Sequence, residues 1–254
     1  MFSIDKNLCV DCGLCVKNCP MSIFYRDKAG TVAVREGTCL NCFHCTAACA
    51  VGAISHSELG RASEELPTDD SSLLSRLQRR RSIRHFKDTT PDRAVIQAAL
   101  DGAAYAPSAK NDRRYQWTVV LGSEAVNRAL DLLLAYAKGE PHLRHLVWLN
   151  RQGINPITCG APCLVLAHCP EDCANPVVDS AIATTLAEQL LNDAGLGTCW
   201  GGYFQRISNH CAALREELAI PEGHTVHTVL MVGYPDEHYS RLPARPAAQI
   251  HWVE

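Results

Sequence analysis

The strongest constraint in this sequence is a cysteine pattern that occurs twice near its start. The spacing Cys-x2-Cys-x2-Cys-x3-Cys covers residues 9–19 and again residues 39–49. These two copies contain eight of the 14 cysteines, and the other six lie between residues 159 and 211. Because an internal repeat defines architecture, we expect the first part of the chain to fold as two related halves around its cysteines.

Cysteines spaced this closely point to iron–sulfur chemistry. Three of them can bind three corners of a cuboidal cluster, while the fourth, three residues on, points toward the other cluster. The pattern therefore predicts two [4Fe–4S] clusters that exchange their fourth ligands. One would be bound by Cys9, Cys12, Cys15 and Cys49, and the other by Cys39, Cys42, Cys45 and Cys19. Zinc and disulfides are the alternatives, but zinc sites prefer two separated cysteine pairs.

Residues 1–57 resemble a bacterial two-cluster ferredoxin in this double motif, with Pro20 directly after the fourth cysteine of the first copy. The second copy departs from the family, because Ala50 stands where a second proline is usual. This change loosens the turn after Cys49 without removing a ligand. His44 lies inside the second motif, and we expect it beside the cluster or in solvent rather than bound to iron, because four cysteines complete the ligand set.

The composition changes after the cysteine repeat. Residues 58–70 are polar and predict a linker, followed by a second domain over residues 71–254, with Asp70 or Ser71 as a candidate N-cap. We expect helices over 73–81, 90–105, 123–137, 178–194 and 209–218, the second starting at Thr90-Pro91. We expect strands over 116–121, 163–168 and 227–232. Helices outnumber strands without strict alternation, so the fold class is α+β.

Three segments of the second part carry patterns that are weak when taken alone. Residues 79–84, Arg-Arg-Arg-Ser-Ile-Arg, offer guanidinium forks and a hydroxyl to a phosphate, or form a basic helix end. Residues 106–111, Ala-Pro-Ser-Ala-Lys-Asn, form a turn with polar tips. Residues 195–204 are rich in glycine, which lets a flat ligand approach the backbone or marks a helix stop and a bulged strand. Trp200 occupies the third glycine position of a dinucleotide fingerprint, so we exclude that motif.

In this order, the three segments resemble the FMN-dependent nitroreductase family over about residues 75–254. Gly-Ala-Pro at 160–162, Val-Gly-Tyr-Pro at 232–235 and Leu-Pro-Ala-Arg at 242–245 strengthen the resemblance. The whole chain resembles a ferredoxin–nitroreductase fusion. The resemblance implies a mixed, mainly antiparallel sheet flanked by helices, a bound FMN, and a homodimer whose two subunits share the flavin site.

The family pattern also implies which residues contact FMN. The phosphate and ribityl chain would be held by Arg80, Arg81, Ser82 and Arg84, with Arg245 reaching the phosphate from the C-terminal segment. The flavin would be lined by Pro107, Ser108 and Asn111, and its edge by Gly202 and Tyr203. The pattern departs from the family at Arg113-Arg114, where Gln-Pro is usual. Arginine cannot accept a hydrogen bond, so Arg113 would place positive charge beside the ring instead.

The remaining reactive or aromatic side chains receive structural interpretations. A third metal site could use Cys159, Cys163, Cys169 and Cys173, but two of these flank an apolar strand, and free cysteines are commonly buried. Cys199 is expected to pack near the flavin rather than act as a nucleophile. Trp148 and Tyr203 are candidates for stacking on a substrate, although we expect both in the core.

The two halves together predict a converter of electrons. Clusters transfer single electrons, whereas flavin handles one or two, and the protein positions both cofactors. We expect an oxidoreductase that takes electrons from a low-potential ferredoxin or flavodoxin and reduces nitroaromatic or related electron-poor compounds, with no catalytic side chain. The alternatives are ene, quinone or dehalogenating reduction, a non-catalytic electron-transfer module for a protein partner, and a redox sensor.

Composition narrows the setting in which this chemistry takes place. The formal net charge of −3 gives no footprint for nucleic-acid binding. No apolar run approaches the roughly 18 residues of a membrane span, and the first residues lack the apolar stretch of a signal peptide. We therefore expect a cytoplasmic protein without a nucleic-acid or membrane partner.

Overall fold

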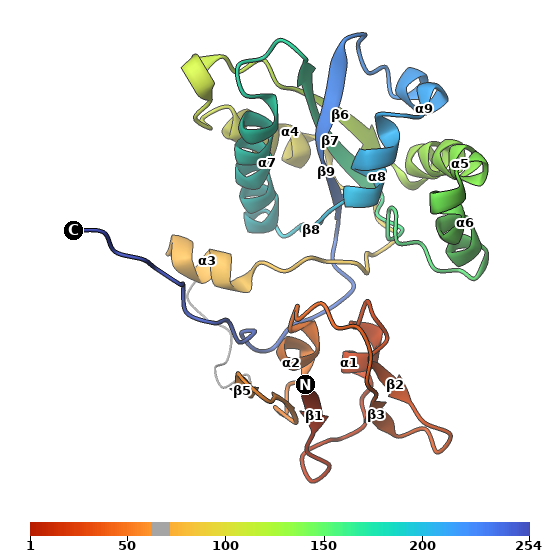
Figure 1. The fold of residues 1–254 in the computed structure, drawn as a ribbon, viewed down its shortest axis with the longest axis vertical. Helices are drawn as coiled ribbons and strands as arrows, with labels where there is room; N and C mark the ends of the chain where they lie inside the picture. Colours follow the sequence, from red (N-terminus) through yellow and green to blue (C-terminus); the bar gives the residue numbers. More distant parts are fainter. Residues whose placement is uncertain (62–71) are drawn as a thin grey trace. The chain divides into compact units, whose positions relative to one another are not determined.

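The structure, a computed structural model, describes residues 1–61 and 72–254, which fall into two units (Figure 1). Unit 1 comprises Met1–Arg79 together with the C-terminal segment Glu237–Glu254, and unit 2 comprises Arg80–Asp236. Within the described ranges, every helix is too short or too polar to cross a membrane.

These units divide the chain differently from the predicted domains. The prediction assigns all of residues 71–254 to the second domain, whereas Glu237–Glu254 belongs to unit 1. The predicted linker 58–70 also begins as regular structure, because Gly60–Arg61 (β5) pairs with Ile54–His56 (β4). The rest of that linker, and the candidate N-caps Asp70 and Ser71, lie outside the described residues.

Unit 1 repeats one structural plan on the two halves of the cysteine pattern. Each half has a cysteine loop followed by a short helix, Leu14–Lys17 (α1) or His44–Ala48 (α2). Phe2–Ile4 (β1) joins β4 and β5 in an antiparallel sheet, and Phe24–Arg26 (β2) pairs with Val32–Val34 (β3). The small core of this unit includes Phe2, Ile23, Phe24, Val32, Phe43 and Ile54.

Unit 2 is built on a four-stranded sheet in the order β6-β7-β9-β8, with antiparallel neighbours. Its strands are Gln116–Leu121 (β6), Cys163–Pro170 (β7), Gly197–Trp200 (β8) and His224–Gly233 (β9). Ser82 adds a parallel bridge to Thr198, so the sheet is mixed and its β8 edge is covered. The predicted α+β class, with a mixed, mainly antiparallel sheet, is confirmed.

Helices pack on both faces of this sheet. They are Arg93–Ala103 (α4), Ser123–Gly139 (α5), Arg144–Arg151 (α6), Pro176–Asp193 (α7), Gly202–Ser208 (α8) and Ala212–Glu217 (α9), while Leu73–Arg79 (α3) belongs to unit 1. Short 3-10 turns cover Ala109–Asn111 (η1) and Pro141–Leu143 (η2). The helices bury two separate cores against the central strands.

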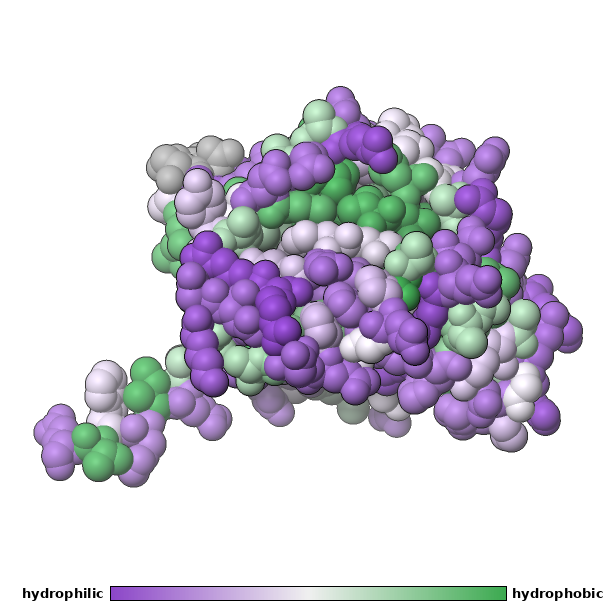
Figure 2. Space-filling view, turned by 90° about the horizontal axis from the view of Figure 1, so that it is seen from above, coloured by the Kyte–Doolittle hydropathy of each residue, from purple (hydrophilic) through white to green (hydrophobic). Residues whose placement is uncertain are grey.

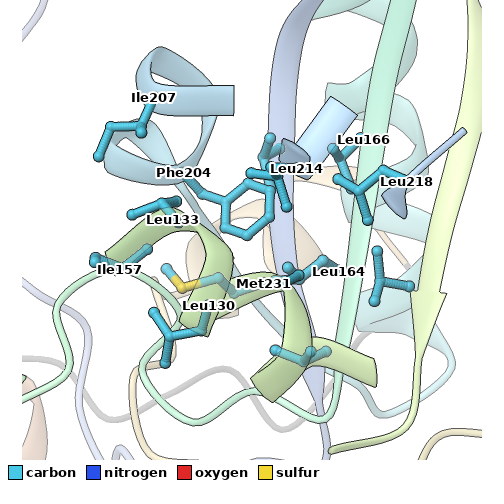
Figure 3. Close-up of a cluster of buried hydrophobic side chains, with 14 of the residues drawn as sticks. Leu130, Leu133, Ile157, Leu164, Leu166, Phe204, Ile207, Leu214, Leu218 and Met231 are labelled. Carbon is cyan, nitrogen blue, oxygen red and sulfur yellow. The ribbon is translucent and has the colours of Figure 1, made fainter. Parts of the chain in front are cut away.

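The alternation of side chains along β7 explains the two cores. Leu164 and Leu166 enter one core with α5, α8 and α9 (Figure 3). Cys163 and Val165 enter the other core with α4 and α7. Because both faces are covered, β7 is apolar along almost its whole length, as a doubly covered strand requires.

The structure also corrects several predicted boundaries. The helix predicted from residue 90 begins at Arg93, because Asp92 is the N-cap and accepts a hydrogen bond from Ala94 N at 2.8 Å. The helix predicted over 209–218 is the shorter α9, because Cys211 is its N-cap. The glycine-rich stretch contains β8 and then α8. We did not predict this helix, because its N-cap and its first residue are glycines. The three predicted strands, over residues 116–121, 163–168 and 227–232, correspond to β6, β7 and β9.

A pair of histidines lies where the β7–β9 register shifts. His168 is buried, with its Nδ1 2.9 Å from His224 Nδ1 and its Nε2 3.0 Å from Thr118 Oγ1. Burial, together with electrostatic repulsion from His224, Arg215 and His227, lowers the pKa of His168 from 6.5 to about 4. The folded protein therefore holds this imidazole neutral at a pH where an exposed histidine is charged.

We expect the protein to lose stability as the pH falls from about 6.5 toward 4. In that window the unfolded chain binds a proton that folded His168 does not bind, which favours unfolding. Above pH 6.5 both states are neutral and the effect disappears. His168→Gln should flatten this pH dependence by roughly 1–3 kcal/mol, measured from urea midpoints by circular dichroism.

His210→Gln is the matched control, because His210 is exposed. It should leave the wild-type pH dependence in place. An unchanged pH dependence in His168→Gln would contradict the assignment to His168.

Candidate functional site

Two cavities in unit 1 sort the first eight cysteines into two sets of four. One cavity, of about 350 Å³ including space open to solvent, is lined by Cys9, Cys12, Cys15 and Cys49. The other, of about 320 Å³ on the same measure, is lined by Cys19, Cys39, Cys42 and Cys45. These sets have the same members as the ligand sets predicted from the spacing, so each cavity takes three thiols from one repeat and the fourth from the other.

The backbone turns in the same way around each cavity. In both repeats, the residues on either side of the second cysteine have positive φ: Asp11 and Gly13 in the first, Asn41 and Phe43 in the second. A bulky side chain rarely adopts this conformation, and such strain concentrates at functional sites. The turns direct the three clustered cysteines of each repeat toward one cavity.

The fourth cysteines also have matching surroundings. Cys19 Sγ accepts a hydrogen bond from Ile23 N at 3.3 Å, and Cys49 Sγ accepts one from Ala53 N at 3.2 Å. Both donors lie four residues after their cysteine. Hydrogen bonds of this kind stabilise a thiolate and tune a bound cluster.

The protonation of the thiols depends on what the cavities hold. Burial raises the pKa of Cys15 to about 11 and also raises the pKa of Cys45, and the neighbouring thiols of each set add to the rise. Because thiolates bind metal, a cationic group must displace these protons. All 14 cysteines are free thiols, and no three His, Cys, Asp or Glu side chains of the described residues converge as on a single ion. Four thiols around a cavity fit a polynuclear cluster.

In unit 2, the arginine-rich and glycine-rich segments meet along the edge of β8. Ile83 N donates a hydrogen bond to Thr198 O at 2.8 Å. Gly197 permits this approach, because a Cβ at that position would lie 2.7 Å from Ile83 Cγ1. Residues 80–84 therefore continue the sheet beyond β8.

Glu188 of α7 holds both segments from the interior. Its carboxylate is buried and accepts hydrogen bonds from Thr198 Oγ1 at 3.0 Å, Trp200 Nε1 at 3.2 Å and Arg80 Nη1 at 3.4 Å. A buried carboxylate needs such partners. Sequence reasoning missed Glu188, although an acid on the inward face of a largely apolar helix was the available signal.

The side chains of residues 80–84 form a compact set of donors. Arg81 is buried, and its Nη1 donates to Arg80 O at 2.6 Å, while Arg84 Nη1 donates to Ser82 O at 3.1 Å. Three guanidinium groups and one hydroxyl thus occur within five residues at a sheet edge. This donor set fits a phosphate ester such as that of FMN.

Cys199 lies behind the same segment. Burial raises the pKa of its thiol, and the Ser82 hydroxyl and the Arg84 charge only partly oppose that rise. The thiol therefore stays neutral near pH 7. This state agrees with a packing role and gives no support to a nucleophile.

The predicted flavin-lining residues Pro107, Ser108 and Asn111 lie in a second loop that rests on α7. Ala109 N donates to Asp179 Oδ1 at 3.0 Å. Lys110, Asn111 and Arg113 all have φ between 48° and 55°. Such strain again marks a functional loop.

The two loops contact different parts of α7. Asp179 anchors the loop of residues 107–113 and Glu188 anchors residues 80–84, and these acids are nine residues apart, or roughly 14 Å along the helix axis. Within one subunit, the structure therefore does not bring the two predicted groups of FMN contacts to one place on α7.

Other predicted positions have clear surroundings. Arg114 is held by carboxylates, with Nε 3.0 Å from Asp112 Oδ1 and Nη1 3.1 Å from Asp172 Oδ1, whereas Arg113 is exposed. This explains why an arginine can stand at position 114. The exposed side chain of Arg113 adds a positive charge to the loop.

The two aromatic candidates, Tyr203 and Trp148, differ in their exposure to solvent. Gly202 and Tyr203 begin α8, and the Tyr203 ring lies 5.2 Å from the Arg206 guanidinium and 6.2 Å from the His145 ring. Tyr203 packs against the core, as predicted. The core position expected for Trp148 is wrong, because its side chain on α6 is 60% exposed.

Arg245 lies in unit 1, where its guanidinium is 6.0 Å from the centre of the Phe43 ring. The late cysteines Cys163 and Cys169 are buried along β7, and burial raises the pKa of both thiols.

Comparison with known proteins identifies both parts. The nitroreductase family matches residues 77–234, which is more than half of the chain. This chain belongs to the nitroreductase family. Residues 1–50 match the 4Fe-4S dicluster domain. The chain is therefore an oxidoreductase of the nitroreductase family whose first part is an iron–sulfur domain.

Individual relatives agree with this assignment. A protein of Archaeoglobus fulgidus named as a putative NADH dehydrogenase/NAD(P)H nitroreductase is 29% identical over 65% of this chain and 86% of its own length. A ferredoxin of Pyrobaculum islandicum is 38% identical over 25% of this chain and 55% of its own length. The crystal structure of a nitroreductase with bound FMN from Bacteroides fragilis shares the fold, with 22% identity, a TM-score of 0.61, and coverage of 74% of this chain and 100% of that one.

We expect Gly197→Ala to separate residues 80–84 from β8. The new Cβ would lie 2.7–2.9 Å from three side-chain atoms of buried Ile83, so the sheet edge must shift. The free energy of unfolding should fall by roughly 1–3 kcal/mol in urea denaturation. Gly139→Ala is the matched control, since a Cβ there meets no atom within 4 Å. Equal losses in the two variants would show that the close contact does not matter.

Proposed function

We propose that this chain passes electrons from a low-potential donor through two [4Fe–4S] clusters to FMN, and thereby reduces nitroaromatic or related electron-poor compounds. The observation that carries the proposal is the pair of four-cysteine cavities in the same chain as a nitroreductase-family domain. Bound clusters would supply one-electron transfer, and bound FMN would join it to two-electron reduction of a substrate.

The residues of the chain would bind and orient these groups. The clusters would be held by the two sets of cysteines that line the cavities. Arg80, Arg81, Ser82 and Arg84 would hold the FMN phosphate, supported through Glu188 and the β8 edge. No side chain is assigned to a chemical step. The Arg113 charge would lie beside the flavin and favour its reduced form.

The separation of the two loops on α7 supports a homodimer as part of this proposal. α7 buries one face, yet Val178, Ile182, Leu186 and Leu190 form a partly exposed apolar stripe at four-residue spacing. A helix that is apolar all round is usually covered. Hydrophobic residues also gather in a band between hydrophilic ones on the face seen in Figure 2. A partner subunit could cover the stripe and bring its loop of residues 107–113 to residues 80–84 of this one.

An anaerobic reductive titration of the purified protein, followed by a pulse of a simple nitroaromatic, tests the function. Iron should reach about eight atoms per chain for two four-iron clusters. Cluster and flavin absorbance should both bleach on reduction and both recover after the pulse. Reduced ferredoxin, reduced flavodoxin and NAD(P)H are compared as donors, because the named relatives include a putative NAD(P)H nitroreductase.

Each outcome decides between functions. Recovery of both chromophores supports the proposal. Bleaching without recovery favours ene, quinone or dehalogenating reduction, or a non-catalytic electron carrier. Fast reduction by NAD(P)H alone would overturn the proposed donor.

We expect Arg84→Ala to weaken FMN binding by about tenfold or more, because a charge-assisted contact to a phosphate is worth about 1.5–3 kcal/mol. Iron content should not change, since the eight cysteines of the two repeats lie in unit 1 and Arg84 lies in unit 2. FMN release by ultrafiltration and iron analysis measure the two effects. Arg151→Ala, an exposed arginine of α6, is the control. Loss of iron along with FMN would contradict the assignment of the two cofactors to separate units.

A further inference from the structure

The C-terminal segment of unit 1 holds the second cysteine repeat. In Figure 1 this segment runs beside α2. Ser240 N and Arg241 N both donate to Ala47 O, at 2.9 and 3.0 Å. These bonds satisfy a carbonyl near the end of α2 that the short helix leaves without an internal partner. We name residues 239–245 the strap.

The strap also binds the turn after Cys49. Arg241 Nε and Nη2 donate to Ala50 O at 3.2 and 2.9 Å. The guanidinium lies against Gly52, where a Cβ would be 3.4 Å from Arg241 Cζ. Gly52 has φ +64°, a conformation that favours glycine at this turn.

The two repeats differ at this turn. In the first repeat, Pro20 follows the fourth cysteine and fixes its own φ. In the second repeat, Ala50 has no such restriction, and the Arg241 fork binds its carbonyl instead. One turn is therefore fixed by a ring, and the other by a contact from the opposite end of the chain.

Two further contacts reach the loop between Cys42 and Cys45. Tyr239 is buried, and its hydroxyl lies 3.4 Å from His44 Nδ1. Arg245 lies over the ring of Phe43, whose φ of +62° is unfavourable for a bulky residue. We expected His44 beside the cluster or in solvent. In the structure its side chain is buried and packs against the ring of Tyr239.

We propose that the strap is a positioning element for the cluster bound by Cys9, Cys12, Cys15 and Cys49, and that Arg241 does at the turn after Cys49 what Pro20 does at the turn after Cys19. The proposal rests on the proposed function in that it requires loaded clusters. Arg241 fixes the turn that follows Cys49, the fourth ligand of this cluster, so its loss should loosen this cluster and spare the other. The residues act through the turn and do not bind iron.

Cluster release under a chelator tests this proposal. The full-length holoprotein is mixed anaerobically with excess chelator, and the loss of cluster absorbance is followed over time. In Arg241→Ala, about half of the absorbance should bleach at least tenfold faster than in the wild type, while the other half keeps its rate. Tyr239→Phe removes a contact to the loop of the other cluster, so adding it to Arg241→Ala should leave the rate of the fast half unchanged.

A second-site change gives a specific rescue. Cys49 is extended, with φ −83° and ψ 92°, and so lies outside the α region that a following proline disfavours, and Ala50 N–H donates none of the described hydrogen bonds. Ala50→Pro added to Arg241→Ala should therefore restore the slow release. A merely general destabilisation would not be repaired at this one position. Tyr25→Phe and Arg151→Ala are the matched controls and should release both clusters at wild-type rates.

The outcomes separate the two proposals. Wild-type protein without iron overturns the proposed function. Iron-loaded wild type with unchanged release in Arg241→Ala, or with both halves accelerated equally and no rescue by Ala50→Pro, overturns the role of the strap alone. If Arg241→Ala cannot be purified with iron, Arg241→Lys, which keeps the charge but loses the two-nitrogen fork, and the rescued double variant decide the question by the same measurement.

Discussion

Unit 1 depends on one electrostatic constraint, the close approach of four thiols at each of two cavities. Burial and the neighbouring thiols raise the pKa of Cys15 to about 11 and also raise the pKa of Cys45, so these two thiols stay protonated on their own. Only a cationic group can make four adjacent thiolates favourable. The rest of unit 1 is thin, with three-residue strands and a small core, so its stability follows from this requirement more than from apolar burial.

Unit 2 is arranged around a different device, a helix that carries buried acids. α7 packs against the sheet, and two of its carboxylates, those of buried Asp179 and Glu188, accept hydrogen bonds from the loop of residues 107–113 and from β8 with Arg80. Asp179 fixes the loop of residues 107–113, and Glu188 fixes both Arg80 and Trp200. Buried carboxylates on a packed helix such as α7 can thus hold strained or cationic segments in place by accepting their hydrogen bonds.

The sequence predicted what depends on local spacing. The doubled cysteine motif predicted the two sets of thiols, and apolar runs predicted β6, β7 and β9, because short-range patterns determine both. It did not predict α8, since glycines at 201–202 disfavour a helix that tertiary packing nevertheless stabilises. It also missed Glu188 and the strap. Their partners lie far away in the chain, as with Tyr239 and His44, and no spacing rule links residues 195 positions apart.

The strap has a consequence for how the protein is made. Unit 1 is assembled from both ends of the chain, which crosses into unit 2 after Arg79 and returns after Asp236. Ribosomal synthesis delivers the cysteine loops before unit 2 and residues 237–245 after it, while domains usually fold as they emerge. The turn after Cys49 can therefore gain its Arg241 contact only after all of unit 2 has been synthesised. A fragment that ends after the cysteine repeat therefore lacks the strap and is not equivalent to the complete unit 1.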